Sequence, residues 1–188
     1  MEIVIIRHGK SVLDISGKVS AAEFGGFTRD YDSAGIDENY LPPTRVIEKA
    51  RSCNFSVCSS LARSLHSAKL LKIENPDVVS PLFRECEMPY NNWKYPKLSI
   101  SNWPLVYRIL QILGYSPNAE SYKEIKSRSK ECAMHLIELA QAHGSVLYVG
   151  HGVLSWVLHK HLLNMGWLGP AKSVRAHWEC GVYKYNKT

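Results

Sequence analysis

Short apolar runs alternate with longer amphipathic stretches along this chain, and this alternation constrains the fold more than any other feature. The runs at residues 3–6, 55–59 and 145–149 have the length and composition of buried β-strands. Apolar residues at helical spacing follow the last two runs, over 61–71 and 153–163. Strands that alternate with helices form a mostly parallel sheet covered by helices. We therefore predict a three-layer α/β/α sandwich around a mostly parallel central sheet.

Three further helices are predicted from apolar residues that recur every three or four positions. They cover residues 44–53, residues around 105–113, and a longer stretch over 122–143 that ends at the His143-Gly144 pair. Ser59 and Ser60 are both candidates for the N-cap of the helix over 61–71.

The remaining segments are predicted to be short strands and loops. Val78 and Val79 fit a short strand, and the alternation over 174–183 predicts a final, half-exposed strand at or near a sheet edge. Residues 14–43 are rich in Gly, Ser, Asp and Pro and are predicted to be mainly loop. Residues 82–93 have no steady period and are expected to form an ordered loop.

The length and composition of the chain fit one domain, which we predict to span residues 1–188. With 45% hydrophobic and 21% charged residues, a chain of this length can bury a proper core. No segment approaches the roughly 20 apolar residues that a membrane span needs, and the start of the chain lacks the pattern of a secretory signal. A cytoplasmic protein without a membrane partner is therefore expected.

The charge of the chain points to a small acidic substrate. The formal net charge is +6, but Lys and Arg are scattered and form no run of the kind that follows nucleic acid. The five tryptophans are too dispersed for a base-stacking platform. We expect no nucleic-acid partner, and a basic RNA-binding domain remains an alternative.

Cysteines and histidines give no indication of a metal site. The five cysteines are an odd number at irregular spacing without a C-x-x-C pair, which argues against a disulfide framework and a zinc knuckle. His159 and His161 lie two residues apart on a predicted helix and therefore point to different faces. Reduced, mostly structural thiols and no bound metal are expected.

Arginines and histidines gather where predicted strands end. The sequence RHG at 7–9 follows the first strand, Arg63 follows the second, and GHG at 150–152 follows the strand over 145–149. The carboxyl ends of parallel strands share one edge of a sheet, where ligands of α/β proteins bind. These three segments are therefore expected to converge.

Such a cluster suits a phosphate group. Guanidinium groups match phosphate oxygens in pairs, and the first amides of a helix add positive potential. A neutral imidazole beside these arginines can attack phosphorus and form a covalent intermediate. No metal is required for this chemistry if the arginines supply the positive charge.

The chain resembles the histidine phosphatase superfamily, in its phosphoglycerate mutase-like branch. The resemblance lies in RHG at 7–9, SSLARSLHSA at 59–68, FRE at 83–85, ES at 120–121 and VGHG at 149–152. These motifs run in the family's order and span nearly the whole chain.

The resemblance implies a role for each matched residue. His8 would be the nucleophile and become phosphohistidine. Arg7, Arg63 and His151 would hold the phosphoryl oxygens and stabilise the charge of the transition state. Glu85 would protonate the leaving oxygen and then activate water.

Several neighbouring positions complete the predicted site. Glu87 lies two residues after Glu85, and the sequence leaves open which of the two carboxyl groups is the acid. The other residues expected to contact the substrate are Gly9, Lys10, Ser11, Glu87 and Gly152.

Three departures from the family's usual pattern concern the substrate. Leu61 stands where an aspartate is common, MPYNNW at 88–93 stands in place of GxWEG, and Lys10 replaces the usual Glu or Gln. The proposed catalytic residues are unaffected.

The function that the resemblance implies is metal-independent hydrolysis of phosphomonoesters, without a cofactor, on a small phosphorylated molecule or a phosphoprotein. The segment over about 90–121 is expected to cap the site and select the substrate. Mutase-type phosphoryl transfer is an alternative, although 188 residues leave little room for a mutase's long insertions. A non-catalytic phospholigand-binding or scaffold protein is another.

Overall fold

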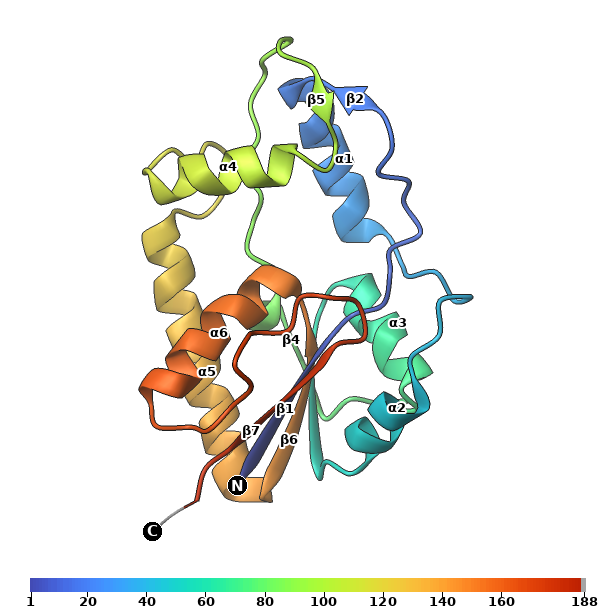
Figure 1. Ribbon diagram of the computed structural model, residues 1–188, viewed down its shortest axis with the longest axis vertical. Coiled ribbons are helices and arrows are strands. Elements are labelled where there is room, and N and C mark those ends of the chain that lie inside the picture. Colours follow the sequence, from blue (N-terminus) through green and yellow to red (C-terminus); the bar gives the residue numbers. More distant parts are fainter. Residues whose placement is uncertain (187–188) are drawn as a thin grey trace.

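The computed structural model describes residues 1–186, and its centre is a five-stranded sheet (Figure 1). Residues 187–188 of the predicted domain lie outside the described part. The strands are β1 (Glu2–Arg7), β3 (Phe55–Ser59), β4 (Val78–Ser80), β6 (Ser145–Gly150) and β7 (Cys180–Lys184). Their order across the sheet is β4-β3-β6-β1-β7.

The sheet is parallel except at one edge. β1 and β3 both pair in parallel with β6, and β4 pairs in parallel with β3, whereas β7 runs antiparallel to β1. Arg7 lies opposite Gly150, and Cys58 lies opposite Val149. The predicted, mostly parallel sheet with its last strand at an edge is confirmed. Its register brings the carboxyl ends of three strands together.

One face of the sheet is covered by two helices, α5 (Tyr122–His143) and α6 (Gly152–Asn164). Side chains alternate between the faces of a strand, so Ile3 and Ile5 of β1 point into this layer. They belong to an apolar cluster with Leu136 of α5 and buried residues of α6. Burial of this cluster fixes both helices against the sheet.

The opposite face carries α2 (Thr44–Arg51) and α3 (Ala62–Leu70). Val4 and Ile6 of β1 point to this face, opposite to Ile3 and Ile5. They pack there with Ala68 and with buried residues of α2. The two clusters on opposite faces make the three layers of the predicted sandwich.

A further group of elements lies beyond the carboxyl edge of the sheet (Figure 1). It consists of α1 (Ala21–Ser33), α4 (Trp103–Ile112) and a two-stranded antiparallel sheet of β2 (Lys18–Val19) and β5 (Leu98–Ser99). The segment over 90–121 contains two of these elements. The other two come from the region before residue 34.

Stacked aromatic rings join α1 to α4. The ring of Phe24 lies 6.1 Å from that of Trp103 and 5.9 Å from that of Tyr107, both nearly parallel to it. All three residues are buried. This apolar cluster is separate from the two that cover the sheet.

The structure corrects the prediction that residues 14–43 are mainly loop, because α1 lies within them. Gly25 and Gly26 weaken the helix signal in the sequence. The helix begins with a capping box, in which the Ser20 hydroxyl accepts the Glu23 amide and the Glu23 carboxylate accepts the Ser20 amide. This cap and the aromatic contact with α4 offset the two glycines.

Two smaller predictions also differ from the structure. The final strand begins at Cys180 and not at Val174, because residues 174–179 are irregular despite their alternation. The N-cap of α3 is Leu61 and not Ser59 or Ser60, since Ser59 still belongs to β3.

The other predicted helices and strands are present, with bounds shifted by a few residues. Residues 82–93 are loop apart from the end of a short 3-10 helix at Pro81–Phe83. All five cysteines are free thiols. Among residues 1–186, no helix is long and apolar enough to cross a membrane.

Candidate active site

The three predicted segments converge at the carboxyl edge of the sheet. Arg7 ends β1, Gly150 ends β6, and the His8 amide donates to the Gly150 carbonyl at 2.9 Å. A cavity of about 500 Å³ opens there, with Arg7, Arg63 and Glu85 in its wall. His8 and His151 are buried beside Arg7 and Arg63 and do not themselves line the cavity.

The imidazole of His8 is held as a neutral ring with one free nitrogen. Its Nδ1 lies 2.7 Å from the Gly9 carbonyl oxygen, which only accepts, so Nδ1 carries the proton and Nε2 keeps its lone pair. Burial, with help from His151 and the nearby arginines, holds the pKa of His8 well below its ordinary value. At neutral pH, Nε2 is therefore a base and a nucleophile.

His151 lies next to His8, with ring centroids 5.2 Å apart. Its Nε2 is 2.6 Å from the Ser59 hydroxyl oxygen, which also accepts the Leu61 amide. We assign the Ser59 hydroxyl as the donor to Nε2, which places the proton of the neutral ring on Nδ1. Burial lowers the pKa of His151 well below its ordinary value. Its Nδ1 has no hydrogen-bond partner among the described residues and is a free donor.

Arg63 is almost completely buried at the first turn of α3. Its Nη1 donates to the Tyr31 carbonyl at 2.8 Å, and its Nη2 donates to Asp32 Oδ1 at 3.2 Å. The guanidinium also lies over the Tyr31 ring, 4.6 Å from the centroid. Helix α1, which the sequence analysis missed, thus orients this arginine.

Arg7 is fixed from the other side of the site. Its Nη1 donates to the Arg175 carbonyl, and its Nε is buried without a partner from any described residue. A Cβ at Gly152 would lie only 3.3 Å from the guanidinium carbon. The glycine of the second GHG motif therefore gives Arg7 room at the start of α6.

Glu85 points its carboxylate at the N-terminus of α6. It accepts the amides of Val153 at 3.1 Å, of Leu154 at 2.9 Å, and of Cys86 at 2.9 Å. Burial raises the pKa of Glu85, but the neighbouring Arg108 and these amides outweigh burial and hold the pKa below its ordinary value. Glu85 is therefore ionised near neutral pH.

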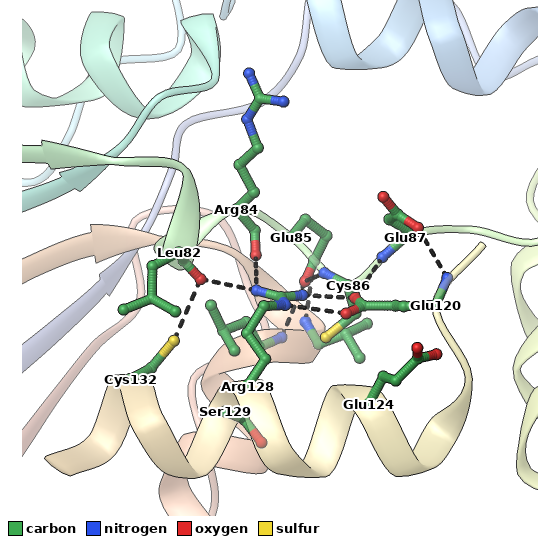
Figure 2. Close-up of polar contacts among 12 residues, drawn as sticks. Leu82, Arg84, Glu85, Cys86, Glu87, Glu120, Glu124, Arg128, Ser129 and Cys132 are labelled. Carbon is green, nitrogen blue, oxygen red and sulfur yellow. Dashed lines mark hydrogen bonds and ion pairs between the residues drawn. The ribbon is translucent and has the colours of Figure 1, made fainter. Parts of the chain in front are cut away.

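Glu87 makes a different set of contacts. Its Oε2 accepts the Glu120 amide at 2.8 Å, and its own amide donates to the Glu120 carboxylate at 3.0 Å. Glu87 lies in the cavity wall, but it is exposed to solvent and its carboxylate is bound to the backbone of Glu120 (Figure 2).

Arg128 of α5 binds both the loop that carries Glu85 and the loop that carries Glu120 (Figure 2). Its guanidinium binds both carboxylate oxygens of Glu120 and also donates to the carbonyls of Leu82 at 2.8 Å and Arg84 at 3.0 Å. The loop that carries Glu85 is thereby fixed to helix α5.

The remaining predicted residues are placed less directly at the cavity. Lys10 is exposed, and neither it nor Ser11 lines the cavity of about 500 Å³. Ser11 is buried in an isolated bridge with Ile36. The amide of Gly9 donates to the Ser67 hydroxyl at 2.9 Å.

Sequence reasoning missed three neighbours of the site. Ser59 holds His151, Arg108 lies beside Glu85, and the His177 Nδ1 donates to the His8 carbonyl at 3.0 Å. Parallel pairing of two predicted strands would have placed Ser59 next to the GHG turn. No signal in the sequence distinguishes His177 or Arg108 from surface residues.

Comparison with known proteins now identifies the family. Residues 44–179 match the model of the histidine phosphatase superfamily (branch 1). The chain therefore belongs to this superfamily, and the predicted resemblance is confirmed. Arg7 and His8 lie before the matched segment. No curated protein matches the chain.

Solved structures share the fold. A protein encoded by an open reading frame of Mycobacterium tuberculosis is 14% identical, with a TM-score of 0.65 over 98% of this chain and 91% of that one. An α-ribazole phosphatase from Shigella flexneri is 20% identical, with a TM-score of 0.60 over 100% and 92%. A mycobacterial glucosyl-3-phosphoglycerate phosphatase is 19% identical, with a TM-score of 0.57 over 87% and 79%.

Proposed function

We propose that the protein is a metal-independent phosphatase that hydrolyses phosphomonoesters through phosphohistidine on His8. The observation that carries the proposal is the pairing of a bare Nε2 on buried His8 with the unpartnered Nδ1–H of His151, whose ring centroid is 5.2 Å away. One nitrogen attacks phosphorus while the other donates to a phosphoryl oxygen. The buried Nε atoms of Arg7 and Arg63 are further free donors for this anion.

In the first step, a bond forms between His8 Nε2 and phosphorus while the bond from phosphorus to the ester oxygen breaks. The leaving oxygen takes a proton from Glu85. The Coulomb field of Arg7 and Arg63 stabilises the charge that develops on the phosphoryl oxygens.

The protonation of Glu85 follows from the charge of the substrate. Before substrate binds, the amides of α6 and the neighbouring Arg108 keep this carboxylate ionised. A phosphate dianion in the cavity raises the pKa of a nearby carboxyl group, because like charges disfavour ionisation. Glu85 takes up one proton from solvent as the dianion binds, and this protonated carboxyl group is the acid of the first step.

In the second step, the Glu85 carboxylate removes a proton from water. The water oxygen bonds to phosphorus, and the bond between phosphorus and His8 Nε2 breaks. Phosphate and neutral His8 are released.

Turnover of p-nitrophenyl phosphate with and without a chelator tests the proposal. We expect chelator-resistant hydrolysis and a phosphoprotein that is labile in acid and stable in base. His8→Ala should abolish both, whereas His143→Ala, which changes an exposed histidine in the last turn of α5, should affect neither. Undiminished turnover by His8→Ala would refute the mechanism, and phosphate binding without any turnover would favour the scaffold alternative.

A further inference from the structure

Beyond the phosphate end, the cavity wall is largely apolar. Phe24 and Phe27 of α1 contribute to it, together with Met88, Tyr90 and Ile100 of the segment that leads into α4. A volume of about 500 Å³ lies in the range of cavities that enclose a small organic ligand. This part of the cavity is where the leaving group of a phosphomonoester would lie.

The aromatic part of this wall is rigid. Phe27 stacks between Phe24, at 6.2 Å, and Tyr31, at 6.0 Å, and Phe24 continues the stack to buried Tyr107 of α4. The apolar cluster between α1 and α4 therefore holds Phe27 in place. When the rings that contact a ligand are already fixed, binding does not have to immobilise them, and an aromatic ligand therefore binds more tightly.

Tyr90 is fixed on the opposite segment by a glycine. A Cβ at Gly25 would lie 2.5 Å from the Tyr90 ring, so the ring packs directly on the helix backbone. Arg29 lies over the same ring, 5.7 Å from its centroid. The position of Tyr90 thus depends on α1, as that of Phe27 does.

The charges of the cavity fit one phosphate and not a second anion. Four arginines and three carboxylates line it, a formal charge of +1; a bound phosphate dianion and the proton that Glu85 takes up bring this charge to 0. Arg63 is already paired with Asp32, and Arg108 donates to the carbonyls of Cys86 and Glu87. Arg29, over the Tyr90 ring, has no ion-pair partner among the described residues, but it is exposed to solvent. A carboxylate on the leaving group would therefore meet only an exposed cation, and exposed ion pairs contribute little.

We propose that this protein prefers phosphomonoesters whose leaving group is uncharged and apolar, with an aromatic ring that packs on Phe27 and Tyr90. The proposal rests on the proposed phosphatase function and specifies its substrate class. Sugar acids and other leaving groups with a second negative charge are expected to be poor substrates.

Three alkyl phosphates test this preference while leaving the reacting bond similar. They are 2-phenylethyl phosphate, ethyl phosphate and 2-carboxyethyl phosphate. We expect kcat/KM for the phenylethyl ester to exceed that for the ethyl ester by about tenfold to a hundredfold, the scale of an apolar pocket's discrimination. The carboxyethyl ester should fall below the ethyl ester. Equal values for all three would overturn the proposal and leave the phosphatase function intact.

Variants locate the preference in the structure. Phe27→Ala should reduce the ratio of phenylethyl to ethyl turnover by about tenfold, and Phe27→Leu, which keeps apolar volume but no ring, should give an intermediate ratio. Leu105→Ala is the matched control, because Leu105 belongs to α4 but is 66% exposed and does not line this cavity. An unchanged ratio in folded Phe27→Ala and Phe27→Leu would count against the proposed wall.

Binding of stable analogues separates failure of the two proposals. Calorimetry should show tighter binding of 3-phenylpropylphosphonate than of propylphosphonate. If that preference is present and no ester is hydrolysed, the inferred ligand class stands and the phosphatase function fails. If the two phosphonates bind equally, the inferred class is wrong, whatever the turnover.

Discussion

Arg128 and Glu120 form a bidentate ion pair, with 2.9 Å between Nε and Oε2 and 2.5 Å between Nη2 and Oε1. Both side chains are mostly buried. The pair joins helix α5 to the loop that presents Glu85, because the same guanidinium also holds the carbonyls of Leu82 and Arg84. Arg128 is therefore a positioning residue for the proposed acid.

Replacing Arg128 by lysine tests this role. Arg128→Lys keeps the charge but loses the planar fork that binds two oxygens and two carbonyls at once. We expect a loss of roughly 1–3 kcal/mol in the free energy of unfolding. Turnover of an alkyl phosphate should fall by about a hundredfold, the scale of a 1 Å misplacement. Chemical denaturation and kcat measure the two effects.

Comparing an alkyl phosphate with an aryl phosphate shows whether Arg128 positions Glu85 or only stabilises the fold. An aryl phosphate, whose leaving group needs less protonation, should lose much less turnover than an alkyl phosphate in Arg128→Lys. Lys123→Met, which removes an exposed charge from the same helix, should change neither stability nor turnover. A uniform loss on both substrates would mean that Arg128 acts on the fold and not on Glu85.

Ser59 is expected to set the tautomer of His151. Ser59→Ala removes the hydroxyl that lies 2.6 Å from Nε2, so the proton of the neutral ring is no longer held on Nδ1. We predict a fall in kcat of about tenfold or more, below the full loss of one transition-state donor. Ser60→Ala is the control, since that hydroxyl accepts a hydrogen bond from Arg84 and makes no hydrogen bond with a histidine of the described chain. Equal kcat values for the two variants would contradict the assigned tautomer.

The sequence predicts the sheet and both helical layers because each depends on local periodicity. The exception is α1, whose Gly25 and Gly26 conceal the helix. A helix there depends on Phe24 packing against rings some 80 residues later in the chain, which is a tertiary contact that local spacing does not contain. The capping box at Ser20 was nevertheless visible as S-x-x-E.

The order of the motifs also predicts that Arg7, Arg63 and His151 lie near one another. It does not predict which residues hold the side chains of the site in place. Asp32 reaches Arg63 only because α1, which lies beyond the carboxyl edge of the sheet, packs against α3. His177 reaches His8 because β7 begins late, so the preceding irregular segment passes over the site. Both contacts depend on how the chain runs in space between distant segments. The spacing of apolar residues within one segment does not predict this path.

The two buried histidines of the site, His8 and His151, predict part of how stability depends on pH. Their pKa values are lowered on folding by burial and nearby cations, so the unfolded chain binds protons that the folded chain does not. Their contribution is complete above pH 6.5 and is lost as the pH falls below it. Each should add a slope of up to about 1.4 kcal/mol per pH unit to the free energy of unfolding.

Denaturation of the wild type and of His8→Gln between pH 7 and pH 5 measures this slope. The variant should lose stability less steeply on acidification, by close to one proton. Glu85 does not interfere, because its lowered pKa affects stability only as the pH falls through and below the ordinary range of a glutamate. Parallel curves for the two proteins would show that His8 is protonated alike in the folded and unfolded chains.

The final prediction distinguishes Glu85 from Glu87 as the general acid. A general acid contributes typically 10²–10⁴-fold, and its contribution shrinks when the leaving group needs no proton. Glu85→Gln should therefore slow hydrolysis of an alkyl phosphate far more than that of p-nitrophenyl phosphate. Glu87→Gln should show no such dependence, because Glu87 is exposed and contacts the Glu120 backbone, whereas Glu85 lies at the start of α6, directly after His151. Initial rates for both variants on both substrates decide the matter. A leaving-group dependence in Glu87→Gln alone would transfer the acid role to Glu87 while leaving His8 as the nucleophile.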